Sequence, residues 1–206
     1  MMSLTMAIAD FIPVFLFAAS AVLLQRDMYG LMSKGAYALF AGGTTLIVVA
    51  GALKAIWKLL YAIQLCDFAV LNACFFPLQS VGFLLGGLGM IAYLFHKQGV
   101  TAYSAAPAVF SGTMLFVAIL IFGMLSITGG LAVVAKRKKT IGGMICFLFA
   151  FVFLLMMGYL SSRDFSKASM HWIAQCVNTV AQLFLLGGAI KLHRAMGTEE
   201  GKPLAE

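Results

Sequence analysis

Long runs of apolar residues alternate with short polar segments along the whole chain, and this pattern predicts its elements. Several runs exceed the roughly 18 apolar residues that a helix needs to cross a bilayer. We predict an all-α polytopic membrane protein with six transmembrane helices, which six consecutive crossings would arrange as three hairpins. The predicted helices cover residues 5–24, 35–54, 69–95, 108–135, 141–160 and 168–190.

The segment between the second and third predicted helices fits two structures. Residues 55–67 are mostly apolar but include the charged residues Lys58 and Asp67 and the aromatic residue Trp57. Such a segment can lie along the membrane surface as an amphipathic helix. It can equally be the end of a long, tilted second helix.

Composition places the whole chain in the membrane class. Hydrophobic residues make up 63% of the 206 positions and charged residues only 10%, whereas a soluble domain is nearer ~45–50% and ~25%. The predicted transmembrane domain covers 1–194 and leaves only a polar tail at 195–206. A formal net charge of +7 could suggest a nucleic-acid partner. We exclude that partner because the charges lie in short links, where they set topology and meet lipid headgroups.

Basic residues in the links predict the orientation. With six crossings, nine Lys and Arg residues fall on one side and five on the other. The positive-inside rule then places both termini and the polar tail in the cytoplasm, in a bacterial-type inner membrane.

Two short matches suggest an internal repeat. A shift of 137 positions carries Arg26-Asp27 onto Arg163-Asp164 and the segment 51–54 onto 188–191. The first hairpin would then resemble the last in the same orientation. This predicts a parallel repeat about an axis near the membrane normal, with the three hairpins in a pseudo-threefold arrangement.

The last predicted helix carries a polar stripe. Its members are His171, Gln175, Asn178, Thr179 and Gln182, which occupy an arc of about 100° on one helix face. Polar groups rarely face lipid, so this face should contact other helices or a wet cavity.

Three further residues extend the candidate site. Asp10 lies about two turns inside the first helix and should be protonated, paired across helices, in contact with water, or at the interface. Pro13 lies one turn later and can free a backbone carbonyl nearby. In the third helix, Asn72 and Gln79 share one face.

These observations predict a protein that binds or transports a small polar solute or ion through an interior formed by the first, third and sixth helices. The candidate ligand-binding residues are Asp10, Asn72, Gln79, His171, Gln175, Asn178 and Gln182. A non-enzymatic sensor, assembly or accessory module is the alternative, followed by a lipid-acting enzyme that uses Asp164 and His171. Membrane lipids are the expected partners, and a homo-oligomer is left open.

We expect no metal and no cofactor. The four cysteines form no CxxC pair, and no nucleotide, zinc-protease or serine-hydrolase motif occurs. His171 and Cys176 are spaced poorly for shared ligation, and a third ligand is absent nearby in the sequence.

Overall fold

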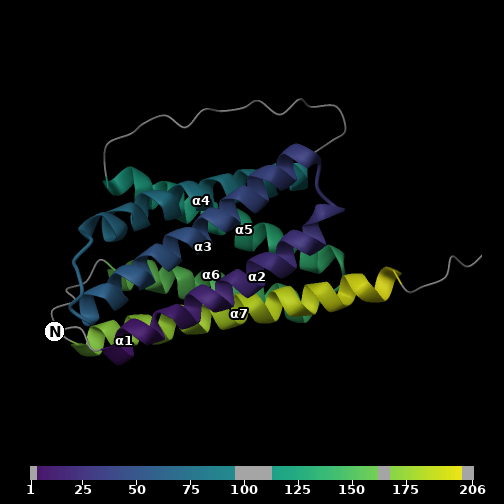
Figure 1. Ribbon diagram of the computed structural model, residues 1–206. Helices are drawn as coiled ribbons and strands as arrows, with labels where there is room; N and C mark the ends of the chain where they lie inside the picture. The colour runs from purple at the N-terminus through teal and green to yellow at the C-terminus, as the bar shows by residue number, and fades with distance from the viewer. Residues whose placement is uncertain (1–3, 96–112, 162–167, 201–206) are drawn as a thin grey trace, which may run out of the picture.

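The computed structural model describes residues 4–95, 113–161 and 168–200, and all regular structure in these ranges is helical (Figure 1). Six stretches are long and apolar enough to cross a membrane, and the first of them includes both α1 and α2. This supports a multi-pass helical membrane protein. The helices are α1 (Leu4–Ala9), α2 (Phe11–Tyr29), α3 (Lys34–Ala62), α4 (Ala69–Phe95), α5 (Thr113–Arg137), α6 (Ile141–Ser161) and α7 (Ala168–Glu200).

Two boundaries differ from the simplest expectation. Helix α3 runs without a break to Ala62, so the start of the segment 55–67 continues the second span as a long helix. Helix α7 continues to Glu200, so part of the expected polar tail is helical.

Helices α4 and α5 run parallel, which contradicts the predicted middle hairpin. Gly123 of α5 approaches the Phe83 carbonyl of α4, and seven residues further along both helices Gly130 approaches Met90. In an antiparallel pair, the second contact would move in opposite directions along the two helices. The residues that connect them, 96–112, lie outside the described residues.

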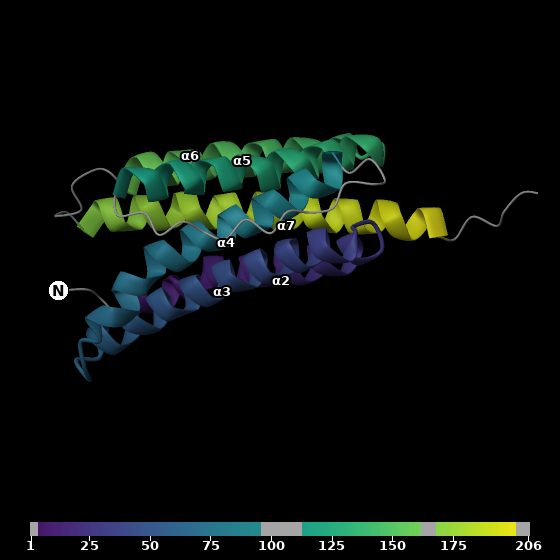
Figure 2. The same cartoon turned by 90° about the horizontal axis from the view of Figure 1, so that it is seen from above.

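The six long helices form a closed ring in which each packs mainly against its two neighbours in the chain, with α7 returning to α2 (Figures 1 and 2). Helices α2 and α7 also run parallel. Gln175 contacts Ala9 at one end of this pair, and His193 contacts Asp27 at the other.

The described ends of the chain therefore lie at opposite ends of the bundle. Helix α1 begins at one end and α7 finishes at the other (Figure 1). This differs from the predicted arrangement, in which an even number of antiparallel crossings brings both ends of the chain to one side of the membrane.

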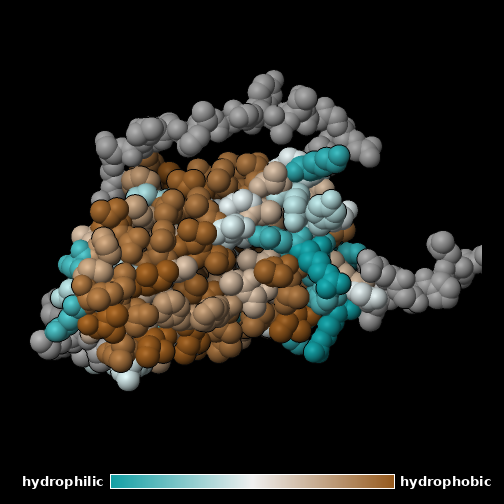
Figure 3. Space-filling model, viewed as in Figure 1, coloured by the Kyte–Doolittle hydropathy of each residue, from teal (hydrophilic) through white to brown (hydrophobic). Residues whose placement is uncertain are grey.

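Basic residues also divide differently between the two ends. We call the end with the α2–α3 and α5–α6 turns the basic end; Figure 3 shows hydrophilic residues gathered there beside a broad apolar surface. The opposite end, where α4 and α7 begin, is called the polar end because of the side chains described below; among described residues it holds Lys54 and Lys58. The basic end holds Arg26, Lys34, Lys136, Arg137, Lys138, Lys139, Lys191 and Arg194.

This distribution leads to a topology prediction. In a cysteine-free background, Leu65→Cys and Lys138→Cys should be labelled by an impermeant maleimide from opposite sides of the membrane. Lys138→Cys should be reached from the cytoplasm because the basic end carries the excess of positive charge. Gly30→Cys, in the α2–α3 turn at the basic end, is the control and should behave like Lys138→Cys. Labelling of Leu65→Cys and Lys138→Cys from one side would contradict the arrangement.

The ring consists of two similar three-helix units, α2–α3–α4 and α5–α6–α7. The helices of each unit run in the same sequence of directions. Gly89 of α4 lies against the backbone nitrogen and Cβ of Phe40 of α3, and Gly188 of α7 lies against the ring of Phe147 of α6. Phe40 and Phe147 are 107 positions apart and both fully buried. These matches are those expected of two units related by a pseudo-twofold axis along the bundle.

Helices α4 and α7 correspond without a gap when shifted by 99 positions. The segment Gln79-Ser80-Val81-Gly82 then aligns with Asn178-Thr179-Val180-Ala181, and Asn72 aligns with His171. Buried positions coincide as well, including Met90 with Ala189. This shift of 99 positions is smaller than the 107 positions between Phe40 and Phe147, because α3 is eight residues longer than α6.

The repeat predicted at a shift of 137 is not the one in this bundle. That shift pairs α2 with α6, and these helices run in opposite directions (Figure 1). Arg163 and Asp164, on which part of the match rested, lie outside the described residues. The ring of two three-helix units also replaces the predicted pseudo-threefold arrangement of hairpins.

The two halves of the bundle are packed differently. One apolar core joins α2 to α7 around Phe40, Phe147 and Leu131, all towards the basic end. Towards the polar end, no residue of α4 before Ser80 and no residue of α5 within 115–122 is buried. The polar residues of the predicted site lie in this less tightly packed half, where a small apolar cluster of Leu160, Ala174 and Val177 joins α6 to α7.

Candidate functional site

The polar stripe of α7 runs from the polar end towards the apolar core. Gln182 marks its inner limit, since the buried Ala181 and Leu185 surround it in sequence. Its amide nitrogen donates to Asn178 Oδ1 over 3.4 Å, a long hydrogen bond. The Gln182 side-chain oxygen is buried and has no hydrogen-bond partner among the described residues. An unsatisfied buried polar atom costs about 1–3 kcal/mol, so this oxygen indicates a place for a donor group.

Pro13 explains the second polar contact of α7. Proline has no amide hydrogen, so the carbonyl of Ala9, four residues earlier, lacks its helical donor. The helix is interrupted at this point, between α1 and α2. Gln175 Nε2 donates to the Ala9 oxygen over 2.7 Å. The expectation that Pro13 opens a nearby carbonyl is therefore confirmed, and α7 supplies the missing donor.

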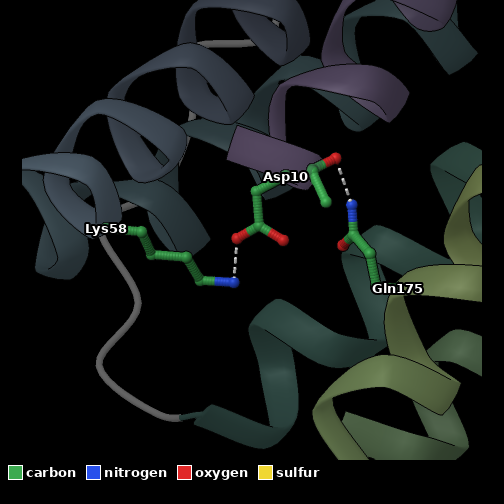
Figure 4. Close-up of polar contacts among 4 residues, drawn as sticks. Asp10, Lys58 and Gln175 are labelled. Carbon is green, nitrogen blue, oxygen red and sulfur yellow. Dashed lines mark hydrogen bonds and ion pairs between the residues drawn. The ribbon is translucent and has the colours of Figure 1, made fainter. Parts of the chain in front are cut away.

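Asp10 lies at the junction of α1 and α2 and forms an ion pair with Lys58 of α3 (Figure 4). Of the expected alternatives, the structure shows pairing across helices. The Asp10 side chain is 9% exposed and that of Lys58 is 17% exposed. Asp10 does not cap α2 through its side chain, because its carboxylate is directed to the lysine. Ion pairing lowers the cost of a carboxylate at this depth.

Two further contacts lie beside this ion pair on α3. Lys54 Nζ lies 3.9 Å from the centre of the Phe75 ring of α4, a cation–π contact. Trp57 Nε1 donates to Asp67 Oδ1 over 2.9 Å in the link to α4. Six antiparallel crossings would place Lys54 and Lys58 among the nine basic residues of one side, together with the Lys136–Lys139 run. In the structure they lie at the opposite end of the bundle from that run.

The structure does not bring the α4 residues into contact with the α7 stripe. Asn72 is exposed and Gln79 half-buried, and neither forms a hydrogen bond within the described part of the chain. Their equivalence to His171 and Asn178 places the two pairs at matching depths on opposite helices of the ring. His171 is half-buried and takes part in at least one hydrogen bond, ring contact or electrostatic interaction.

Sequence reasoning missed two polar contacts between helices. Gln25 Nε2 donates to Thr44 Oγ1 over 2.8 Å, which links α2 to α3. His193 Nδ1 lies 2.6 Å from Asp27 Oδ1, and the second oxygen of this buried carboxylate has no hydrogen-bond partner in the described part of the chain. Asp27 and His193 each lie three residues beyond the end of a predicted helix, 5–24 and 168–190. The signal that could have paired them is the parallel course of α2 and α7, which the sequence does not reveal.

The site offers hydrogen-bonding and charged groups but no metal-ligand cluster. Within the described ranges, no three His, Cys, Asp or Glu residues gather closely enough to hold a metal ion. The four cysteines are free thiols, and Cys66, Cys74 and Cys146 are each half-buried. The chemistry supported by these residues is recognition of polar or charged groups.

Comparisons of the chain with protein-family models, with curated proteins and with solved structures found no match.

Proposed function

We propose that this protein binds, and moves across the membrane, a small polar solute that enters from the polar end of the bundle. The observation that carries the proposal is the buried Gln182 oxygen without a partner. It lies on the polar face of α7, where the less tightly packed half meets the apolar core. A solute that donates a hydrogen bond would satisfy this oxygen.

The two-unit arrangement supports a site near the pseudo-twofold axis. Gln79 of α4 and Asn178 of α7 occupy equivalent positions of the two units. Amide side chains can donate and accept, which suits hydroxyl, amide or amino groups of a solute. In repeat membrane proteins, substrates commonly bind at the interface between the repeats. Asp10, Asn72, His171 and Gln175 would then line the approach from the polar end.

A second candidate is a non-enzymatic membrane module. The contacts of Gln175 with Ala9 and of Asp10 with Lys58 favour it, because these polar groups already satisfy one another. In that case the polar stripe holds helices together and binds no solute. The enzyme alternative relied on Asp164, which lies outside the described residues.

Replacement of Gln182 separates the two candidates. Gln182→Leu should raise the thermal unfolding temperature of the solute-free protein in detergent, because it removes a buried unsatisfied oxygen. It should also abolish stabilisation by solutes in a panel of sugars, polyols, amines and amino acids. Gln175→Leu is the comparison. It should destabilise the protein by about 1 kcal/mol because it leaves the Ala9 carbonyl without a donor.

The result would go against the proposal if no panel member stabilised the native protein, or if Gln182→Leu kept the full solute response. The first outcome would favour the membrane module.

A further inference from the structure

We propose that Lys54 and Lys58 form a binding site for an anionic phosphate or carboxylate group at the polar boundary of the membrane. The site lies on α3, next to α4, and does not depend on the solute proposed for Gln182. The ligand is either the headgroup of an anionic lipid or a small free anion, since both present the same chemistry to a lysine.

The length of α3 sets the level of this site. Lys34 and Lys54 are twenty positions apart on one helix. At 1.5 Å per residue this is about 30 Å, which matches the thickness of the hydrocarbon core. Lys34 and Lys54 therefore mark its two boundaries, and the last two turns of α3 extend to the level of the headgroups.

Aromatic residues support this placement. Trp57 and Tyr61 stack with ring centres 5.8 Å apart in these two turns. Tyr61 is 45% exposed, so its ring is available to the surroundings. Tryptophan and tyrosine are enriched where the hydrocarbon core meets the headgroups. Helix α6, the equivalent of α3 in the second unit, lacks these turns, so the site belongs to the first unit.

Ion pairing leaves one of the two cations of the site without a carboxylate partner among the described residues. Two ammonium groups lie one turn apart on α3, and one carboxylate, Asp10, pairs with Lys58. Asp67 is at the same end, but its carboxylate accepts from Trp57 and forms no ion pair with either lysine. Lys54 is half-buried and its ammonium lies over the Phe75 ring. A partly desolvated cation next to an ion pair attracts an anion more strongly than it would in bulk water.

The geometry assigns different roles to the two lysines. Lys54 would bind the anion directly, because the ion pair of Asp10 is with Lys58 and not with Lys54. Lys58 adds positive potential while it stays paired with Asp10. The Phe75 ring fixes the direction of the Lys54 side chain, which lowers the entropic cost of binding.

Thermal unfolding of the purified protein in neutral detergent tests the site. The probes are inorganic phosphate, with chloride at equal ionic strength as its control, and dihexanoyl-phosphatidylglycerol, with dihexanoyl-phosphatidylcholine as its control. At least one anionic probe should stabilise the native protein more than its control does. Lys54→Met should weaken the apparent affinity about fivefold, the contribution expected of one lysine near anionic lipid, whereas Lys54→Arg should preserve it. Lys191→Met, at the basic end, should leave it unchanged.

Each outcome has a defined meaning. A response to phosphatidylglycerol alone identifies a lipid headgroup, and a response to phosphate identifies a free anion; both support the site if Lys54→Met weakens them. The site is wrong if neither anion stabilises the protein beyond its control, or if Lys54→Met responds like the native chain. If Lys54→Met fails to fold, Lys54→Gln takes its place, with Lys54→Arg still the reference.

Discussion

Gly43→Ala should destabilise the protein by about 3 kcal/mol, the upper part of the range for overpacking in a tight interior. A methyl group on Gly43 would overlap the Gly86 backbone nitrogen and the Gly82 carbonyl oxygen of α4. Both obstacles are backbone, so no side-chain rotation can make space. Helices α3 and α4 would have to move apart, with loss of the contacts around Phe40 and Gly89. Thermal unfolding in detergent measures the effect.

The adjacent glycine provides a matched control for this change. Gly42 is exposed, and a methyl group there meets nothing within 4 Å. Gly42→Ala should therefore be neutral or stabilise the helix by up to about 1 kcal/mol, the difference in helix propensity between the two residues. Equal effects of the two alanines would show that α3 and α4 do not meet through Gly43.

Lys58→Met should cost about 3–5 kcal/mol, because it leaves the Asp10 carboxylate buried without a counter-charge. The methionine keeps the apolar length of the lysine, so the loss reports on the charge. Asp10→Asn alone should cost less, since Lys58 has a flexible stem and can reach the headgroup level. Unfolding by heat or by denaturing detergent gives both values.

The double variant tests whether the two residues act as a pair. Asp10→Asn with Lys58→Met removes both charges and should recover most of the stability lost in Lys58→Met. If the two single effects simply added, Asp10 and Lys58 would not be coupled, and the ion pair would have to be abandoned.

The sequence predicted individual helices well because each hydrophobic run is a local signal. All six spans occur where the apolar runs lie, and the continuation of α3 to Ala62 was one of two stated alternatives. The role of Pro13 was also predictable, since a proline affects the carbonyl four residues before it whatever the fold. The Gln175 donor could not be assigned to Ala9, because their contact joins positions 166 residues apart.

Helix directions were the main failure. The basic residues were divided between sides on the assumption that each crossing reverses the last, and the parallel pair α4 and α5 breaks that assumption. Glycines decide this pairing: Gly87 and Gly123 allow the two helices to approach closely. Which glycine faces which helix is a tertiary property. The similarity of the two units was also hidden in the sequence, because no single shift aligns them. Helices α3 and α6 align at a shift of 107 positions, and α4 and α7 align at 99 because α3 is longer than α6.

The closure of the ring by α7 has a consequence for biosynthesis. Asp10 can pair with Lys58 once α3 has left the ribosome. The Ala9 carbonyl can accept from Gln175, and the Asp27 carboxylate can contact His193, only after α7 has been made. Both late partners belong to α7, which is translated after the other described helices. Until it inserts, the first span presents an unsatisfied carbonyl at the end of α1 and a lone carboxylate near the end of α2. A nascent chain that stops before α7 therefore displays polar groups that quality-control proteases and insertion chaperones can recognise.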